Sequence, residues 1–213
     1  MVNISEPTQW EAIASISENP GVYAWYYQPR FTQFDRSALE QLLAKENSPG
    51  GVEKFLARHL FRYFEEVPYE VTLHGPLKPT YSGSVVQTRS ITPELCQRLA
   101  DDGQRREVLW NSLELMVPLF AAPLYIGMAK NLRTRLRGHK RLIEGGLENL
   151  SKNSRNGENS RRDASFAAEV IQRRMAVERL SVYTLELPPE SSSSANDIEN
   201  LMNRITFPIL GRN

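Results

Sequence analysis

The sequence predicts an α+β fold in which a small central antiparallel or mixed sheet is flanked by helices. Residues 21–27 are dense in β-forming side chains and predict the first central strand. A second strand is expected over residues 123–126, ending in a glycine turn that leads into a basic helix. Residues 28–121 lie between the two strands and are far too many for a hairpin loop. The sequence therefore also predicts a large helical and β insertion between the first two core strands.

Two local patterns predict the structure of the N-terminal residues. Thr8 and Glu11 are spaced as in a capping box and predict a short helix over residues 8–17. Alternation within residues 21–27 places the odd-numbered aromatic side chains on one face of the sheet and the even-numbered side chains on the other. We expect one face to pack against the core and the other to carry a site.

Helical and extended patterns follow one another in the insertion and in the C-terminal part. Helices are predicted in the segment that opens at Thr92 and over residues 39–45, 52–65, 105–117, 164–179 and 196–206. Extended segments are expected over residues 69–74, 81–87 and 180–187. Residues 145–162 are poor in apolar side chains and predict a mobile basic loop. Asn196 or Asp197 is expected to cap the last helix, and Pro208 to stop it.

The charge is unevenly distributed, although the formal net charge of the 213 residues is only +1. Residues 130–162 carry ten Lys and Arg against three Glu, a balance of +7, so the rest of the chain sums to −6. Such a basic face is the electrostatic footprint of a nucleic-acid binder. Cys96 has no disulfide partner and is expected to be a buried, inert thiol. No apolar run is long enough to span a membrane and no signal peptide is evident, so we expect a cytoplasmic protein without a membrane partner.

The run from Leu124 to His139 carries the clearest functional signal. Arg135 and His139 are four residues apart on the basic helix, so both project from one helical face. That geometry suits binding of a phosphate group. In an arbitrary basic helix such charges are most often solvated surface residues, so the interpretation depends on the residues around them.

Taken in order, Gly21-Val22-Tyr23, Tyr125-Ile126-Gly127, Arg135, Glu199 and Asn213 resemble the signature of the GIY-YIG nuclease superfamily, with valine in place of the usual isoleucine. The resemblance implies a catalytic core formed by residues 1–27 and 122–213. It does not extend to residues 28–121, which it leaves as an inserted subdomain for DNA recognition or dimerisation.

The resemblance implies a role for each signature residue. Arg135 would bind the scissile phosphate, and His139 would relay a proton or bind phosphate. The hydroxyls of Tyr23 and Tyr125 would reach the nucleophilic water or the phosphate, with Tyr23 as the favoured general base. A phenol has a pKa near ~10, so this role requires a nearby cation or metal to lower it. Asn213 would support the site by hydrogen bonding.

Glu199 is the candidate metal ligand. It lies at the edge of an apolar stripe on the last predicted helix, where the family carries its lone acidic ligand. One carboxylate leaves most of the coordination sphere to water and substrate phosphate, which suits Mg²⁺, with Mn²⁺ as a substitute.

A compact chain with an insertion inside the core most resembles the type II restriction endonucleases of the family. The expected activity is metal-dependent hydrolysis of double-stranded DNA at a short specific site. A palindromic site implies a homodimer, because two-fold DNA symmetry is matched most simply by two-fold protein symmetry. DNA contacts are expected from basic residues of the helix and of the loop after it, namely Lys130, Arg133, Arg137, Lys140, Arg155, Arg161 and Arg162.

Other interpretations remain open at this stage. A structure-specific, single-strand or defence nuclease of the same family would use the same chemistry with different recognition. A non-catalytic nucleic-acid-binding module is a different class, and the presence of all the signature side chains speaks against it. The loop over residues 145–162 would either read bases in the major groove or contact phosphates alone.

Overall fold

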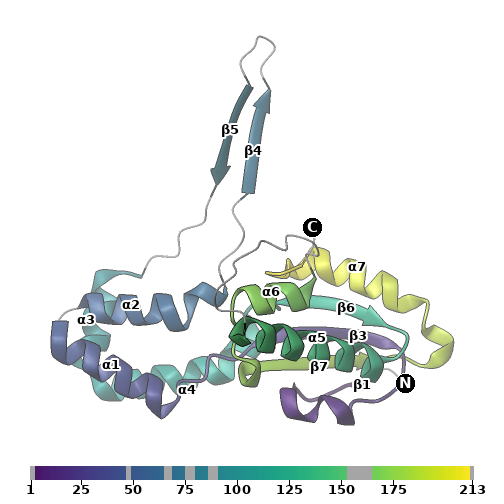
Figure 1. The fold of residues 1–213 in the computed structure, drawn as a ribbon, viewed down its shortest axis with the longest axis horizontal. Helices are drawn as coiled ribbons and strands as arrows, with labels where there is room; N and C mark the ends of the chain where they lie inside the picture. Colours follow the sequence, from purple (N-terminus) through teal and green to yellow (C-terminus); the bar gives the residue numbers. More distant parts are fainter. Residues whose placement is uncertain are drawn as a thin grey trace. The chain divides into compact units, whose positions relative to one another are not determined.

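The computed structural model describes residues 3–46, 49–64, 69–74, 80–85, 91–152 and 165–211 (Figure 1). The fold is mixed α+β with a small antiparallel sheet, as the sequence predicts. Contacts divide the chain into two compact units, of which one is Met1–Arg30 with Asn111–Asn213 and the other is Phe31–Trp110. Among the helices of the described residues, none combines the length and apolarity that crossing a membrane requires.

The first unit is built on a five-stranded sheet. In the order of the sequence its strands are β1 (Asn3–Ile4), β2 (Thr8–Gln9), β3 (Gly21–Tyr27), β6 (Tyr125–Ala129) and β7 (Leu180–Glu186). Every pairing is antiparallel, in the order β1-β7-β3-β6, and β2 also pairs with β7. β3 and β7 therefore lie in the middle of the sheet, and β6 is an edge strand.

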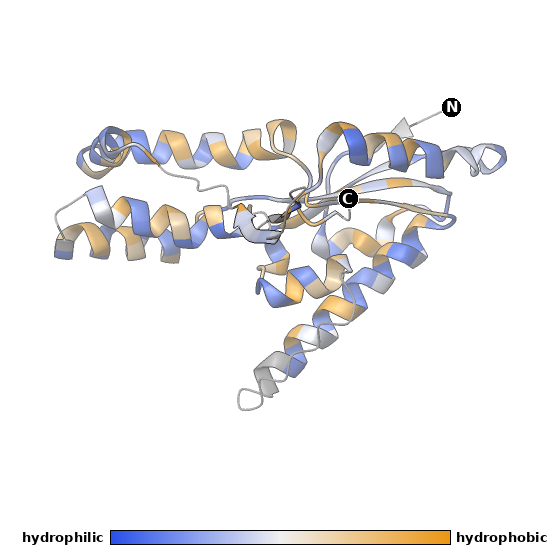
Figure 2. Ribbon diagram, turned by 90° about the horizontal axis from the view of Figure 1, so that it is seen from above, coloured by the Kyte–Doolittle hydropathy of each residue, from blue (hydrophilic) through white to orange (hydrophobic). Residues whose placement is uncertain are grey.

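Two helices, α5 (Leu132–Lys152) and α6 (Phe166–Gln172), cover the face that carries the odd-numbered residues of β3. On that face the buried ring of Trp25 stacks on Phe166 of α6, with the ring centroids 5.2 Å apart. α5 is amphipathic. Figure 2 shows hydrophobic and hydrophilic residues interspersed along the helices. Its buried stripe follows helical spacing and consists of Leu132, Leu136, His139 and Ile143.

The opposite face of the sheet packs against α7 (Ser194–Thr206). Val22, Ile126 and Leu187 form a small core there with Ala195 of α7. This face is less fully covered than the other, since Ala24 and Tyr26 of β3 are half-buried. Because α5 and α7 lie on opposite faces, their side chains can meet only beyond an edge strand, and that strand is β6.

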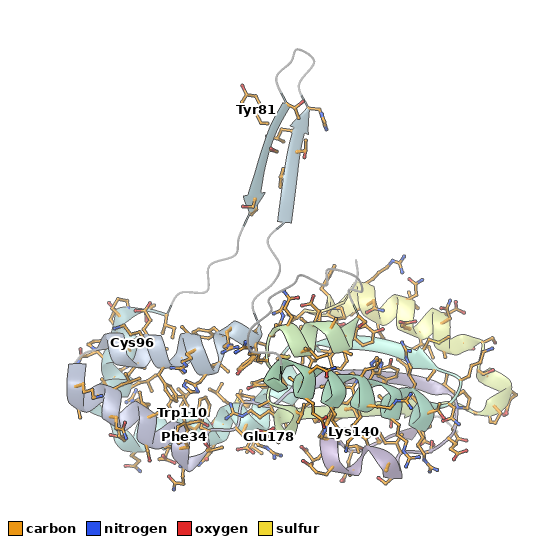
Figure 3. The ribbon with its side chains drawn as sticks, viewed as in Figure 1. Phe34, Tyr81, Cys96, Trp110, Lys140 and Glu178 are labelled. Atoms are coloured by element: carbon orange, nitrogen blue, oxygen red, sulfur yellow. The ribbon has the colours of Figure 1, made fainter. Side chains whose placement is uncertain are left out.

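In the part that the structure describes, the second unit consists of helices and two antiparallel strands. Its elements are α1 (Gln33–Glu46), α2 (Pro49–His59), the 3₁₀ helix η2 (Phe61–Tyr63), β4 (Tyr69–His74), β5 (Thr80–Val85) and α3 (Pro93–Asp101), and α4 (Gly103–Phe120) continues from it into the first unit. Phe31 and Trp110 lie in its core with ring centroids 4.3 Å apart, and Figure 3 labels Trp110. Thr92 caps α3 by accepting the backbone N–H of Leu95, and Cys96 is buried, both as predicted.

The capping-box prediction near the N-terminus is wrong. Thr8 belongs to β2, where it pairs with Val182 of β7, and the helix that follows is the 3₁₀ helix η1 (Trp10–Ser15). Sheet pairing holds Thr8 in extended conformation two residues before the helix begins. Its side chain therefore cannot act as the cap that the local sequence favours.

The loop prediction is wrong for residues 145–152, because α5 continues to Lys152, and the rest of that prediction lies outside the described residues. Gly146 lies inside the helix, where a Cβ atom would come within 2.3 Å of Ile171 Cδ1. The glycine that suggested a loop instead lets α6 pack closely on α5. The helix predicted over residues 164–179 is also shorter, because α6 ends at Gln172 and Arg174 has a φ of 50°.

The remaining C-terminal elements lie close to their predicted positions. The 3₁₀ helices η3 (Val177–Arg179) and η4 (Pro189–Ser191) flank β7. α7 ends at Thr206 as predicted, but it begins at Ser194, so neither Asn196 nor Asp197 is its cap.

Candidate active site

The glycines of the signature allow close backbone packing around the two tyrosines. β6 includes Gly127, so this residue lies inside a strand, paired with Tyr23, and not in the predicted turn. A Cβ atom on Gly127 would lie 2.6 Å from Tyr23 Oη and 2.8 Å from Tyr125 Cε1. At Gly21 a Cβ atom would lie 2.1 Å from the backbone oxygen of Leu185. Glycine is therefore required at both positions by neighbouring atoms, since any side chain would overlap them.

The start of α5 is held in place on two sides. Asn131 Oδ1 accepts the backbone N–H of Thr134 at 2.8 Å, as an N-cap side chain does. The first two N–H groups of the helix donate to backbone oxygens in the segment before β3. These bonds fix the rotation of the helix about its axis, which decides where Arg135 and His139 point.

Tyr23 connects Arg135 and His139 by hydrogen bonds. Arg135 Nε donates to Tyr23 Oη over 3.3 Å, and Tyr23 Oη lies 2.9 Å from His139 Nε2. A guanidinium group can only donate, so the phenolic oxygen is the acceptor toward Arg135. The Tyr23 hydroxyl can then donate to Nε2, provided that the proton of the neutral imidazole is on Nδ1.

Burial keeps the Tyr23 hydroxyl and the His139 imidazole uncharged at neutral pH. It raises the pKa of Tyr23 well above its usual value, with Tyr125 adding to the effect and Arg135 opposing it. Burial, together with the positive charge of Arg135, lowers the pKa of His139 to about 4. His139 is therefore an uncharged imidazole at neutral pH.

A cavity of about 360 Å³ opens beside this hydrogen-bonded chain. Its lining residues come from β6, from α5, from the start of α6, from α7 and from the C-terminal segment, and they are Tyr125, Ile126, Arg135, His139, Ser165, Phe166, Glu199, Asn203 and Gly211. The C-terminal segment is held beside β6, since Leu210 N donates to Leu124 O at 2.7 Å. The cavity thus gathers residues from both faces of the sheet at its β6 edge.

The two signature tyrosines lie differently with respect to this cavity. Tyr125 is half-buried and forms part of the wall. Tyr23 is only 1% exposed and lies behind the wall, in contact with Arg135 and His139. Tyr125 is therefore the phenol that a molecule in the cavity would meet, whereas Tyr23 holds the groups that line it.

Glu199 reaches the cavity from α7, on the other side from Arg135. It is half-buried, and burial raises the pKa of its carboxyl group, an effect that the charge of Arg135 opposes. A positive charge in the cavity would favour the ionised carboxylate. The carboxylate and the guanidinium thus offer a cation-binding group and an anion-binding group to one space.

The donor set at Glu199 fits a hard, hydrated cation. Within the described residues, no group of three or more His, Cys, Asp or Glu side chains could hold a metal ion. A lone carboxylate on a cavity wall matches Mg²⁺, which keeps several waters and often uses one or two carboxylates with substrate phosphate.

The basic residues expected to bind DNA fall into two groups. Lys130 and Arg137 are exposed. Arg133 instead donates to Ile16 O at 2.6 Å, and Lys140, labelled in Figure 3, donates to Trp10 O at 3.1 Å. Arg133 and Lys140 thus hold α5 against the segment that contains η1.

Four predicted site residues lie outside the described residues, namely Arg155, Arg161, Arg162 and Asn213. Conversely, Asn203 lines the cavity although the sequence analysis passed over it. Its spacing of four residues from Glu199 on a predicted helix was a usable signal, because residues i and i+4 share a helical face.

A scan against protein-family models, a search of curated proteins and a search of solved structures find no match to this chain.

Proposed function

We propose that this chain is a metal-dependent endonuclease of the GIY-YIG type that hydrolyses phosphodiester bonds of double-stranded DNA. One observation carries the proposal: β6, α5 and α7 bring Tyr125, Arg135, His139 and Glu199 to a single cavity. A phenol, a guanidinium, an imidazole and a carboxylate are side chains that serve phosphate binding, water orientation and cation binding. Their order along the chain is that of the signature.

In this proposal Arg135 binds the non-bridging oxygens of the scissile phosphate. A guanidinium is planar and always charged, so it can donate to two phosphate oxygens at once. Tyr23 accepts from Arg135 Nε and thereby fixes the plane of the guanidinium. His139 fixes Tyr23 in turn. The Tyr125 hydroxyl, on the cavity wall, orients the attacking water.

Glu199 is the residue that would hold the divalent cation. When bound, Mg²⁺ supplies charge stabilisation for the developing negative charge on the phosphate oxygens. The Glu199 carboxylate also balances the positive charge of Arg135 across the cavity. The site then contains one protein cation for the phosphate and one protein anion for the metal.

The proposed subclass is a type II restriction enzyme that cuts at a short specific site. The inserted unit Phe31–Trp110 supplies additional surface for DNA recognition or for dimerisation. Cutting both strands of a palindrome calls for a homodimer. Sedimentation of the free protein and of its complex with a cognate duplex measures this directly, and a strictly monomeric complex would contradict the subclass.

The test is cleavage of unmodified plasmid and phage DNA with Mg²⁺ or with EDTA, followed by sequencing of fragment ends. Arg135→Ala and Glu199→Gln are each expected to lower the cleavage rate by about 100-fold or more. Arg141→Ala and Asp197→Asn are the matched controls, because each is an exposed residue of the same charge on the same helix. Both controls should cut like the parent.

The fragment pattern separates the proposed subclass from its alternatives. Discrete fragments that share one short palindrome support the restriction enzyme. If the protein cuts flaps or single strands in preference to duplex DNA, the proposed hydrolysis stands, but the protein is a structure-specific or single-strand nuclease and not a restriction enzyme. Folded protein that binds DNA or RNA but cuts neither contradicts catalysis and favours a binding module.

A further inference from the structure

We propose that Asn203 supplies a second oxygen donor, from its side-chain amide, to the divalent cation that Glu199 binds. The inference rests on the proposed function, because it concerns the same cavity. It goes beyond the signature, which contains a single acidic ligand and nothing at this position.

The helix places both side chains on the same wall. Asn203 follows Glu199 by four residues on α7, and side chains at this spacing lie one above the other on one helical face. Both are half-buried and both line the cavity. Asn200, between them in the sequence, is exposed and points elsewhere. α7 therefore presents a carboxylate and an amide to the cavity as a pair.

No described residue forms a hydrogen bond with the side-chain amide of Asn203. Among the described residues its backbone oxygen accepts the N–H of Phe207, whereas its side chain has no hydrogen-bonding partner. Asparagine is also a poorer helix former than alanine, so helix stability gives no reason for it in the third turn of α7. A half-buried polar group that faces a cavity and lacks a protein partner is suited to a ligand.

The chemistry of the cavity favours a cation as that ligand. Side-chain amide oxygens and carboxylates are both ligands for hard divalent cations, either directly or through a bound water. Arg135, on the other side of the cavity, is already placed for the phosphate. The Glu199 and Asn203 side chains together give the cation two attachment points on one rigid helix, which fixes its position relative to Arg135.

The experiment measures Mn²⁺ binding to the full-length protein by electron paramagnetic resonance, without DNA. Asn203→Asp adds a carboxylate at the proposed ligand and is expected to tighten Mn²⁺ binding about tenfold, while Asn203→Ala weakens it severalfold. Asn200→Asp and Asn200→Ala are the matched controls, with the same changes on an exposed face of the same helix, and they should leave affinity unchanged. Thermal unfolding shows whether each variant is folded.

The same shifts are expected in the Mn²⁺ concentration that gives half-maximal cleavage. If the parent binds Mn²⁺ too weakly for spectroscopy, this second readout is the deciding one. Asn203 variants that match the parent in both readouts overturn the inference alone, provided that Glu199→Gln loses binding and the parent cuts DNA. A lower cleavage rate for Asn203→Ala at unchanged metal dependence also overturns it, since the amide would then contact DNA. If the parent neither binds Mn²⁺ nor cuts any nucleic acid, the proposed function fails together with the inference.

Discussion

The Tyr23 hydroxyl lies within hydrogen-bonding distance of both Arg135 and His139 of α5. It accepts from Arg135 Nε and lies 2.9 Å from His139 Nε2, although it is itself almost entirely buried. Its effect on a substrate would therefore be indirect, through the orientation of the guanidinium. A residue with this role can act although it is buried, but it cannot act without its hydroxyl.

Tyr23→Phe is expected to lower the cleavage rate by about 10- to 100-fold, because the guanidinium loses its acceptor while the aromatic packing remains. The measurement is the rate at saturating DNA, compared with DNA affinity and thermal unfolding. Tyr26→Phe is the control, since Tyr26 lies on the other face of the same strand. Equal activity of Tyr23→Phe and the parent would show that Arg135 needs no such support.

His139 makes the stability of the protein depend on pH. Its pKa is lowered in the folded state to about 4, against about 6.5 when unfolded, so the unfolded state binds more protons between these values. The free energy of unfolding therefore rises with pH through this range and is fully present above pH 6.5. Acidification from pH 7 to pH 5 should remove about 2 kcal/mol from this source. Denaturant unfolding of the parent and of His139→Gln at both pH values measures it, and an equal pH dependence of the two proteins would contradict it.

Gly127→Ala should disturb the site by overpacking. A methyl group would overlap the Tyr23 hydroxyl and the Tyr125 ring, at a cost of about 1–3 kcal/mol in unfolding free energy. Gly138→Ala is a matched control on α5, because a Cβ atom there meets nothing within 4 Å. Since alanine favours helix over glycine, the control should gain about 0.5–1 kcal/mol. Chemical denaturation compares the two, and similar shifts would contradict the packing argument.

At the scale of elements, the basic residues of α5 and of the residues just before it fall into two groups, those that bond to the rest of the protein and those that are exposed to solvent. Arg133 and Lys140 donate to backbone oxygens of the segment around η1, and Arg133 also pairs with Glu18 at 2.8 Å. Lys130 and Arg137 are exposed. Arg133 and Lys140 thus attach the helix to the protein, whereas Lys130 and Arg137 are free to contact the proposed DNA substrate.

This division predicts different outcomes for four alanine variants. Lys130→Ala and Arg137→Ala should weaken DNA binding, and each should reduce the dependence of log K on log salt by about one unit. Arg133→Ala and Lys140→Ala should lower the unfolding free energy by about 1 kcal/mol each and leave that slope unchanged. Fluorescence anisotropy over a range of salt concentrations and thermal unfolding provide the measurements. Equal slopes for all four variants would contradict the division.

The elements that the sequence analysis identified correctly are those with a strong local pattern. β3 and β7 alternate, and α5 and α7 carry apolar residues at helical spacing. The errors arise where distant contacts override the local pattern. Thr8 pairs with Val182 in the sheet, and Gly146 lies in a helix at the point where Ile171 packs against it. No periodicity within a segment could have indicated either partner.

The candidate site shows the same division. The order and types of Tyr23, Arg135, His139 and Glu199 were sufficient to propose a nuclease. The burial of Tyr23 and the neutral state of His139 were not accessible, because both depend on how α5 and α6 cover the sheet. The resemblance also directed attention to the terminal asparagine and away from Asn203, which lines the cavity.

At the scale of the whole molecule, the cavity at the β6 edge depends on elements that are far apart in the sequence. Arg135 belongs to α5 and Glu199 to α7, on opposite faces of one sheet, and the segment that seals the edge follows α7. During synthesis the arginine side of the cavity emerges long before the carboxylate side. In the proposed nuclease, a nascent chain would have no complete site before α7 has been synthesised and has docked on the sheet, so it would not yet cut the DNA of the cell that makes it.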